Sequence, residues 1–198
     1  MMRRQILIGV AIGVTAVALG WVLMTNLSRT LRTIEPDPTA DVPAPQQTTP
    51  SATPAVPRIK AMLFYASEDG RGLVAVEQEV PMAEGTVPQA RALVEAQLST
   101  AAPSPLVSTI PEGTTLRGLF VSSRNEAFVD LDATVRDHHP GGSMNELFTV
   151  YTIVNAITTN LPEVETVQVL IDGREVDTLA GHVDLRRPLR KNEALIIP

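Results

Sequence analysis

Hydrophobic residues after position 57 recur with two different periods, which predict both strands and helices. Runs rich in β-branched and aromatic residues, bounded by glycine, asparagine, aspartate or proline, are typical of strands. Six such runs occur: RIKAMLFYA (58–66), LVAVEQEV (73–80), TLRGLFV (115–121), EAFVDLD (126–132), TVQVLI (166–171) and REVDTL (174–179). Their separators predict three strand pairs, and Asp172-Gly173 is a two-residue turn that favours type I′ geometry.

Two longer segments have the 3.6-residue period of helices. They are TVPQARALVEAQL (86–98) and MNELFTVYTIVNAITTNL (144–161). Each starts at or just after a hydroxyl residue that has Gln or Glu three positions later, the spacing of a capping box. We therefore predict that Thr86 with Gln89, and Ser143 with Glu146, cap the two helices. Strand–strand–helix twice, then a hairpin, predicts an α+β fold: one compact domain with a mixed or antiparallel sheet and two helices packed on it.

The helix expected over 144–161 has a distinctive distribution of side chains. Its apolar residues occupy more than half of the circumference, which predicts that the helix is largely buried. The remaining narrow stripe is small and uncharged, and consists of Asn145, Thr149, Thr152, Ala156 and Thr159. Exposed faces ordinarily carry Lys and Glu. This stripe is therefore a candidate interface with another subunit or partner, unless another part of the same chain covers it.

The first 57 residues differ in composition from the rest. Gln5–Met24 is a run of twenty residues without charge, the length of a membrane-spanning helix. A cleaved signal peptide is the alternative, but its apolar core would be shorter and end near small residues, so we predict an uncleaved anchor. Residues 35–57 contain seven prolines among small polar residues, which predicts an extended linker, with an SH3-type ligand as the alternative. The predicted organisation is an anchor with its flanks (1–34), a linker (35–57) and one domain (58–198).

The charges around the apolar segment bear on its orientation. Arg3 and Arg4 precede it, whereas Arg29 and Arg32 follow it. With the terminal amine, this distribution slightly favours a cytoplasmic N-terminus. The C-terminal domain is then expected outside the cytoplasm, in the periplasm or at the cell surface.

Composition excludes several classes of function. The chain has no cysteine, which rules out disulfides, thiolate metal sites, cysteine nucleophiles and lipid attachment through an N-terminal cysteine. From residue 58 onward there are twelve Lys and Arg against nineteen Asp and Glu, which argues against nucleic acid as a partner. One basic cluster contains Arg186, Arg187, Arg190 and Lys191. Its arginines are candidate contacts for peptidoglycan or an anionic wall polymer, and a solvated edge is the alternative.

The segment DHHPGGSMNE (137–146) contains the residue types of an active site. A nucleophilic Ser143 would need a base held by a third group, and its position is already explained by helix capping. The spacing of the glycines here matches neither a phosphate loop nor a dinucleotide fingerprint. We therefore expect a protein without enzymatic activity or cofactor.

The two adjacent histidines, His138 and His139, leave one alternative open. In an extended segment they point in opposite directions, so they are poorly placed to ligate one metal together. One of them would need a carboxylate from elsewhere, and Asp130, Asp132 and Asp137 lie nearby in the sequence. A solvated loop is the simpler interpretation, and we expect no metal site.

Five segments, in order, resemble the GerMN domain family, which is named for a bacterial spore-germination protein. They are LFYASEDGRGLVAVEQEV, STIPEGTTLRGLFV, AFVDLD, GGSMNELFTVYTIVNAIT and VQVLIDGREVDTLAGHVDLRRPL, between Leu63 and Leu189. The resemblance implies a compact α/β domain outside the cytoplasmic membrane, similar to the ring-building motifs of envelope assemblies, with a non-enzymatic scaffolding role. It implies no catalytic residues. The germination protein looks like a lipoprotein with tandem domains, whereas this chain has one domain and no cysteine, which puts a sporulation role specifically in doubt.

Anchor, linker and resemblance together predict a membrane-anchored scaffold or protein-interaction module that binds an envelope protein or a copy of itself. Two other classes remain open. A wall-binding module would use the basic cluster. An envelope hydrolase would require His138, Asp130 and Asp132 to converge in one pocket.

Overall fold

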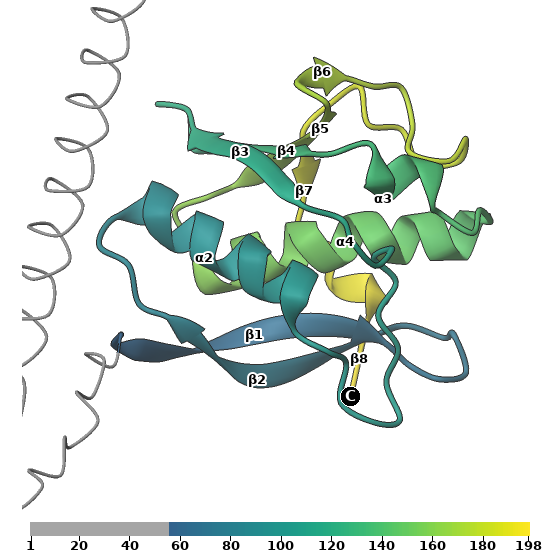
Figure 1. The fold of residues 1–198 in the computed structure, drawn as a ribbon, viewed down its shortest axis with the longest axis horizontal. Coiled ribbons are helices and arrows are strands. Elements are labelled where there is room, and N and C mark those ends of the chain that lie inside the picture. The colour runs from purple at the N-terminus through teal and green to yellow at the C-terminus, as the bar shows by residue number, and fades with distance from the viewer. Residues whose placement is uncertain (1–55) are drawn as a thin grey trace, which may run out of the picture. The chain divides into compact units, whose positions relative to one another are not determined.

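The computed structural model describes residues 56–198. The expected membrane segment Gln5–Met24 and nearly all of the predicted linker lie outside this range. Within residues 56–198, no helix combines the length and the apolar character needed to cross a bilayer. The described residues form two β-sheets, and two long helices lie between them (Figure 1).

The first sheet is built on the first predicted strand pair. Strands β1 (Arg58–Ala66) and β2 (Leu73–Pro81) pair antiparallel over their whole length, from Arg58 opposite Pro81 to Ala66 opposite Leu73. The C-terminal strand β8 (Ile196–Ile197) pairs in parallel with the start of β2. Periodicity could not predict β8 because two residues are too few to show alternation.

The second sheet is mixed. Its strands are β3 (Leu116–Val121), β4 (Glu126–Leu131), β5 (Thr166–Ile171) and β6 (Arg174–Glu175), in that order, with β7 (Leu189–Arg190) paired to the start of β5. Strands β3 and β4 are antiparallel, whereas β4 and β5 are parallel. Asp172 and Gly173 have φ of 51° and 74°, so they form the predicted turn with positive φ at both central positions. The α+β class is therefore confirmed, but the prediction of a single sheet was wrong, because the strands divide into two sheets with the long helices between them.

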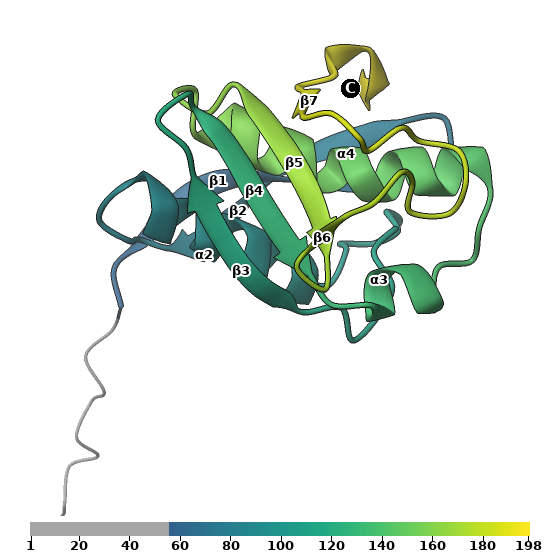
Figure 2. The same ribbon diagram turned by 90° about the horizontal axis from the view of Figure 1, so that it is seen from above.

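The two predicted helices are present, together with a short one that was not predicted. They are α2 (Thr86–Ser99), α3 (Thr134–Asp137) and α4 (Ser143–Asn160). Helix α4 connects the parallel strands β4 and β5 and runs between the two sheets (Figures 1 and 2). It packs on β1, α2 and β5, which explains why its apolar arc covers more than half of its surface.

The edge of β1 that faces away from β2 lies against the helices. Side-chain amides from the helices bind the backbone groups along this edge. Asn160 at the end of α4 accepts from the Met62 amide and donates to its carbonyl, both at 2.8 Å. Gln97 of α2 does the same for Phe64, both at 2.9 Å. These two carboxamides stand where a neighbouring strand would be, so this edge is closed to other chains.

The last predicted strand is shorter than expected. REVDTL was predicted as a strand through Leu179, but β6 ends at Glu175. The chain after it instead folds across β5, where Gln168 donates to the Leu185 carbonyl at 2.6 Å. The prediction was wrong because the backbone amides that follow Asp177 bind a side chain of α4 rather than a strand.

Candidate functional site

The side chain of α4 that binds the backbone amides after Asp177 is Glu146, which has no solvent exposure. Its Oε1 accepts from the amides of Leu179 (2.9 Å) and Val183 (3.2 Å), and its Oε2 accepts from the amide of His182 (2.8 Å). The Nδ1 of His182 lies 3.1 Å from the same Oε2. One carboxylate thus fixes the whole 179–183 loop against the first turn of α4. We call this arrangement the Glu146 clamp.

The clamp keeps its carboxylate ionised. Burial raises the pKa of Glu146, but hydrogen bonds from backbone amides in the loop and from the His182 side chain lower it further, so the pKa lies below its ordinary value of 4.5. A buried anion with this many donors serves structure, because each acceptor site already binds the chain itself. It is not free to act as a general base.

Both capping-box predictions are corrected by this geometry. Ser143 is the first residue of α4 rather than the residue before it, and its exposed hydroxyl makes no hydrogen bond among the described residues. Thr86 likewise begins α2, where its hydroxyl bonds Glu163. In both helices a glycine with positive φ occupies the N-cap position, so no side-chain cap forms. Gln89 instead accepts from the Ala83 amide before the helix, at 2.9 Å.

His139 helps to hold the entrance to α4. Its Nδ1 accepts from the Gly141 amide at 3.0 Å, so its Nε2 carries the proton and lies 3.1 Å from the Thr149 hydroxyl. That hydroxyl donates to the Thr109 carbonyl at 2.6 Å. Burial lowers the pKa of His139, with a smaller opposing influence from the Glu146 carboxylate. The histidine is therefore a neutral structural link between α4 and the loop before β3.

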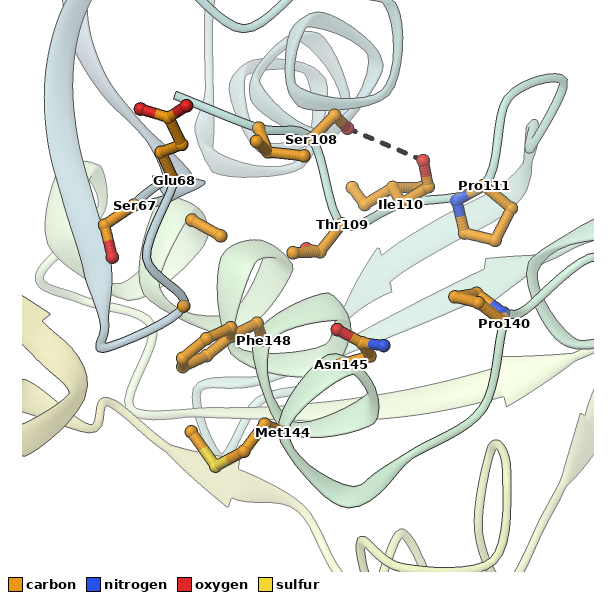
Figure 3. A pocket seen from close by; sticks show the side chains of 13 residues that line it. Ser67, Glu68, Ser108, Thr109, Ile110, Pro111, Pro140, Met144, Asn145 and Phe148 are labelled. Atoms are coloured by element: carbon orange, nitrogen blue, oxygen red, sulfur yellow. Dashed lines mark hydrogen bonds between the residues drawn. The ribbon is translucent and has the colours of Figure 1, made fainter. Parts of the chain in front are cut away.

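Next to these contacts lies a surface pocket of about 360 Å³ (Figure 3). Its walls come from the turn after β1, the loop 107–111 and the first turns of α4, and they include Ser67, Glu68, Val107, Thr109, Met144 and Phe148. Phe148 forms part of the buried core, whereas Val107 and Met144 are 49% and 46% exposed. Apolar side chains thus lie at the mouth of the pocket as well as in its wall.

The lining of the pocket contains few charged side chains. Glu68 is its one carboxylate, and the pocket lining contains no histidine, lysine or arginine. The Ser67 hydroxyl donates to the Asp69 carboxylate at 2.8 Å, which also accepts from Arg71, and Ser108 bonds the Ile110 carbonyl at 3.5 Å (Figure 3). The pocket is suited to binding an apolar side chain of another molecule rather than to chemistry on it.

The residues considered for a hydrolase do not form one site. Asp130 accepts from Arg117 and from the Gly173 amide, at the turn between β5 and β6. Asp132 binds Thr115 and the Thr134 amide. His138 is exposed and makes no side-chain contact of this kind in the described part of the chain. Within residues 56–198 no three His, Asp or Glu residues are placed to hold a metal ion.

The candidate interface on α4 is for the most part inside the domain. Thr149, Thr152 and Ala156 are buried, and Thr159 is partly buried. The loop before β3 covers the first part of the stripe, since the Thr149 hydroxyl bonds Thr109. Ala156 packs in a core cluster with β1 and β2. At the buried positions the stripe is thus covered by other parts of the same chain, which is the alternative left open by the sequence, and Asn145 is exposed and lines the pocket.

The basic cluster is exposed but largely neutralised. Arg186 forms a two-point ion pair with Asp184, with contacts of 2.9 and 2.8 Å, which raises the pKa of Arg186 and lowers the pKa of Asp184. Arg190 lies 3.7 Å from Glu165. Arg187 is exposed and has no ion pair among the described residues. The positive charge open to an anionic polymer is therefore smaller than the sequence indicates.

Sequence analysis missed three apolar features of the surface. Val107 and Met144 flank the pocket, and Phe120 is 53% exposed on β3, where its ring stacks on Phe128. Isolated hydrophobic residues in a sequence do not reveal exposure, because the same letters fill the core. The alternation in TLRGLFV indicated a strand with Phe120 on one face, but not that this face is open.

Comparisons with known proteins agree with the fold. Residues 62–177 match the family model Germane, described as sporulation and spore germination. The tandem GerMN domains of the sporulation protein GerM from Bacillus subtilis are 16% identical, with a TM-score of 0.53, over 68% of this chain and 46% of that one. The chain thus spans about half of that tandem structure. The first GerMN domain alone is 15% identical, with a TM-score of 0.51, over 69% of this chain and 98% of that domain.

A protein of Clostridium perfringens that is described as a lipoprotein is 21% identical, with a TM-score of 0.49, over 71% of this chain and 92% of its own. No curated protein sequence matches. At such identities the structures show a likeness of fold alone, and the family rests on the match over residues 62–177.

Proposed function

The chain belongs to the Germane family of sporulation and spore-germination domains, and on that premise we propose that it is an extracytoplasmic, membrane-anchored interaction domain. It acts as a non-enzymatic scaffold in a bacterial envelope assembly, where it binds an envelope protein or a second copy of itself. The uncharged run Gln5–Met24 supports the anchor, and the proline-rich residues 35–57 support a spacer between bilayer and domain.

One observation carries the interaction role. The surface pocket has an apolar mouth formed by Val107 and Met144, whereas the polar groups beside it bind the chain's own backbone. The Thr149 hydroxyl bonds the Thr109 carbonyl and lies 3.1 Å from His139 Nε2, so two of the pocket walls, α4 and the loop 107–111, are joined before any partner arrives. A preformed apolar opening of this kind suits the side chain of a partner protein, since little ordering is needed on binding.

The interaction is tested by site-specific photo-cross-linking in cells. A photoreactive amino acid at position 144 should yield adducts with an envelope protein or with the chain itself. The same group at position 82 is the matched control, because Met82 is also an exposed methionine, at 53%, but lies outside the pocket. Equal adduct yields at the two positions, or none at position 144, would contradict the pocket as the contact site.

The topology is tested separately. Protease added to intact spheroplasts should remove the domain that follows the linker. If the domain resists protease until the cells are lysed, the extracytoplasmic location is wrong.

A further inference from the structure

Strand β3 is the outer strand of the second sheet, and its free edge is short but regular. The backbone amide of Ser122 donates to the Glu126 carbonyl at 2.9 Å, so Ser122 and Glu126 form a hydrogen-bonded pair of the β3–β4 ladder. In an antiparallel ladder, hydrogen-bonded pairs recur at every second residue. The residue pairs Phe120–Phe128 and Gly118–Asp130 therefore exchange hydrogen bonds. The amides and carbonyls of Leu119 and Val121 point away from β4, and within residues 56–198 they have no partner. This edge can accept another strand.

The face of the sheet next to this edge carries a stacked aromatic pair. The rings of Phe120 and Phe128 lie 4.4 Å apart and are inclined by 3°. Leu119 and Val129 point to the opposite, buried face, so the two rings lie on the side away from the helices. One face of the Phe120 ring contacts Phe128, and its other face is directed past the edge of β3. Only 4% of the chain is aromatic, so placing two phenylalanines on this outer face indicates a contact.

The free edges of β1 and β3 differ in what covers them. Asn160 and Gln97 close the edge of β1 with paired amide hydrogen bonds. Strand β3 has no such cover, and it contains neither lysine nor proline, the residues that commonly discourage pairing at an edge. A β-bulge between Leu116 and Gly118 limits the regular edge to its second half.

We propose that this edge pairs with β3 of a second copy of the chain, in antiparallel orientation. One symmetric register uses the free amides and carbonyls of both Leu119 and Val121 in each copy. Leu119 exchanges hydrogen bonds with Val121 of the second copy, and Phe120 faces Phe120 of the second copy. Facing residues in such a non-hydrogen-bonded pair approach closely. The four phenylalanines then form one continuous stack across a sheet shared by both copies.

The charges beside the edge fit this register. Arg117 bonds Asp130 at 3.3 Å and Asp172 at 2.9 Å, and Arg124 bonds Glu126 at 3.0 Å. In the paired arrangement Gly118 faces Ser122 of the second copy, so the Arg117 cluster of one chain adjoins the Arg124 pair of the other. Each cluster contains both signs, and no unpaired like charges are brought together. In this arrangement the same surface of each copy provides the backbone hydrogen bonds, the stacked rings and the compatible charges. This is the defining property of an isologous interface.

This inference rests on the proposed interaction role and adds to it a second surface, the edge of β3, together with the partner that binds there. It is tested in cells with the full-length chain, which has no native thiol. Two differently tagged copies are co-expressed, one with Gly118→Cys and the other with Ser122→Cys. Position 118 accepts a side chain, since an added Cβ there would lie 3.8 Å from its nearest neighbour. Facing cysteines in this register lie within disulfide reach, so oxidation should yield a dimer that carries both tags.

The matched control is the pair Gly118→Cys with Gly118→Cys, whose thiols would be roughly 13 Å apart along the strand, at about 3.3 Å per residue. We expect at least ten times more dimer from the 118/122 pair than from this control. Equal yields would overturn the pairing. Adding Phe120→Lys to both copies should reduce the 118/122 dimer at least tenfold, whereas Met82→Lys should leave it unchanged. A dimer that is insensitive to Phe120→Lys would also contradict the proposal.

Failure of this inference is distinguishable from failure of the proposed function. Photo-cross-links from position 144 to another envelope protein would preserve the interaction role even if the 118/122 dimer did not form. An adduct between a photoreactive group at position 120 and an unrelated protein, without the disulfide dimer, would show that β3 binds a different extended segment. In that case the second copy is the wrong partner.

Discussion

The Glu146 clamp gives the sharpest stability prediction, which is that Glu146→Gln destabilises the domain without changing its shape. The glutamine oxygen can replace Oε1 and keep the amides of Leu179 and Val183 bonded. Its NH₂ group then faces the backbone amide of His182, which in the wild type donates to Oε2 at 2.8 Å. The charge-assisted hydrogen bond from the His182 amide is lost, the contact of His182 Nδ1 with the charged Oε2 is lost as well, and the NH₂ group and the His182 amide are left as opposed donors. The expected loss is about 1.5–3 kcal/mol of unfolding free energy.

Urea denaturation of residues 52–198, a compact unit of the chain, measures this loss at pH 7. With a dependence of about 3–5 °C per kcal/mol for a domain of this size, the melting temperature should fall by about 5–15 °C. The control is Glu112→Gln, because Glu112 is exposed and forms neither an ion pair nor a side-chain hydrogen bond in the described residues. If the unfolding free energies of Glu146→Gln and Glu112→Gln differ by less than about 0.5 kcal/mol, the Glu146 clamp does not stabilise the domain as proposed.

The same pair of proteins should show a pH signature. Folding lowers the pKa of Glu146, so the wild type gains stability from this group above its ordinary pKa of 4.5 and loses it as the pH falls through the lower folded-state value. The glutamine variant has no such group. The stability difference between wild type and Glu146→Gln should therefore be constant near neutral pH and shrink below about pH 4.5. A difference that stays constant into strong acid would refute the assignment of an ionised, stabilised carboxylate.

Three further changes test other parts of the structure. Gln97→Leu leaves the amide and carbonyl of Phe64 buried without partners, and urea denaturation should show a loss of about 2–4 kcal/mol; a loss under 1 kcal/mol would mean that the edge of β1 finds other partners. Thr152→Glu places a charge at a buried position and should lower the melting temperature, whereas an unchanged value would contradict the burial of the stripe. Arg187→Glu changes an exposed side chain, so it should alter neither the unfolding free energy nor the amount of domain that sediments with purified cell wall. If only the amount bound to cell wall falls, the wall-binding alternative is favoured.

Much of the secondary structure followed from local pattern. RIKAMLFYA and TVQVLI match β1 and β5 residue for residue, because alternation and bounding turn residues are properties of a short stretch. Asp172-Gly173 specified its turn because few residues other than glycine, asparagine and aspartate adopt positive φ easily. The apolar arc of α4 likewise predicted that this helix is buried, since helical spacing maps directly onto the helix surface.

The partners of polar residues were decided by the tertiary structure. The spacing of Ser143 and Glu146 fits a capping box, yet Glu146 binds a loop more than thirty residues away. Local spacing describes which contacts a side chain can make near its own helix, and it carries no information on amides brought in by distant segments. For the same reason, the small residues on α4 did not reveal whether another chain or the same chain covers them. Small, uncharged side chains are suited to both kinds of contact.

The sequence by itself thus determined the elements, their approximate ends and the burial of α4, since these depend on residues adjacent along the chain. Only the tertiary structure decided that β4 and β5 are parallel, that Asn160 and Gln97 close the edge of β1, and that Phe120 lies beside an open edge of β3. Those features depend on which segments meet in space. A phenylalanine on a strand has the same local signal whether its neighbour is a helix, another strand or solvent, and only the packed fold distinguishes them.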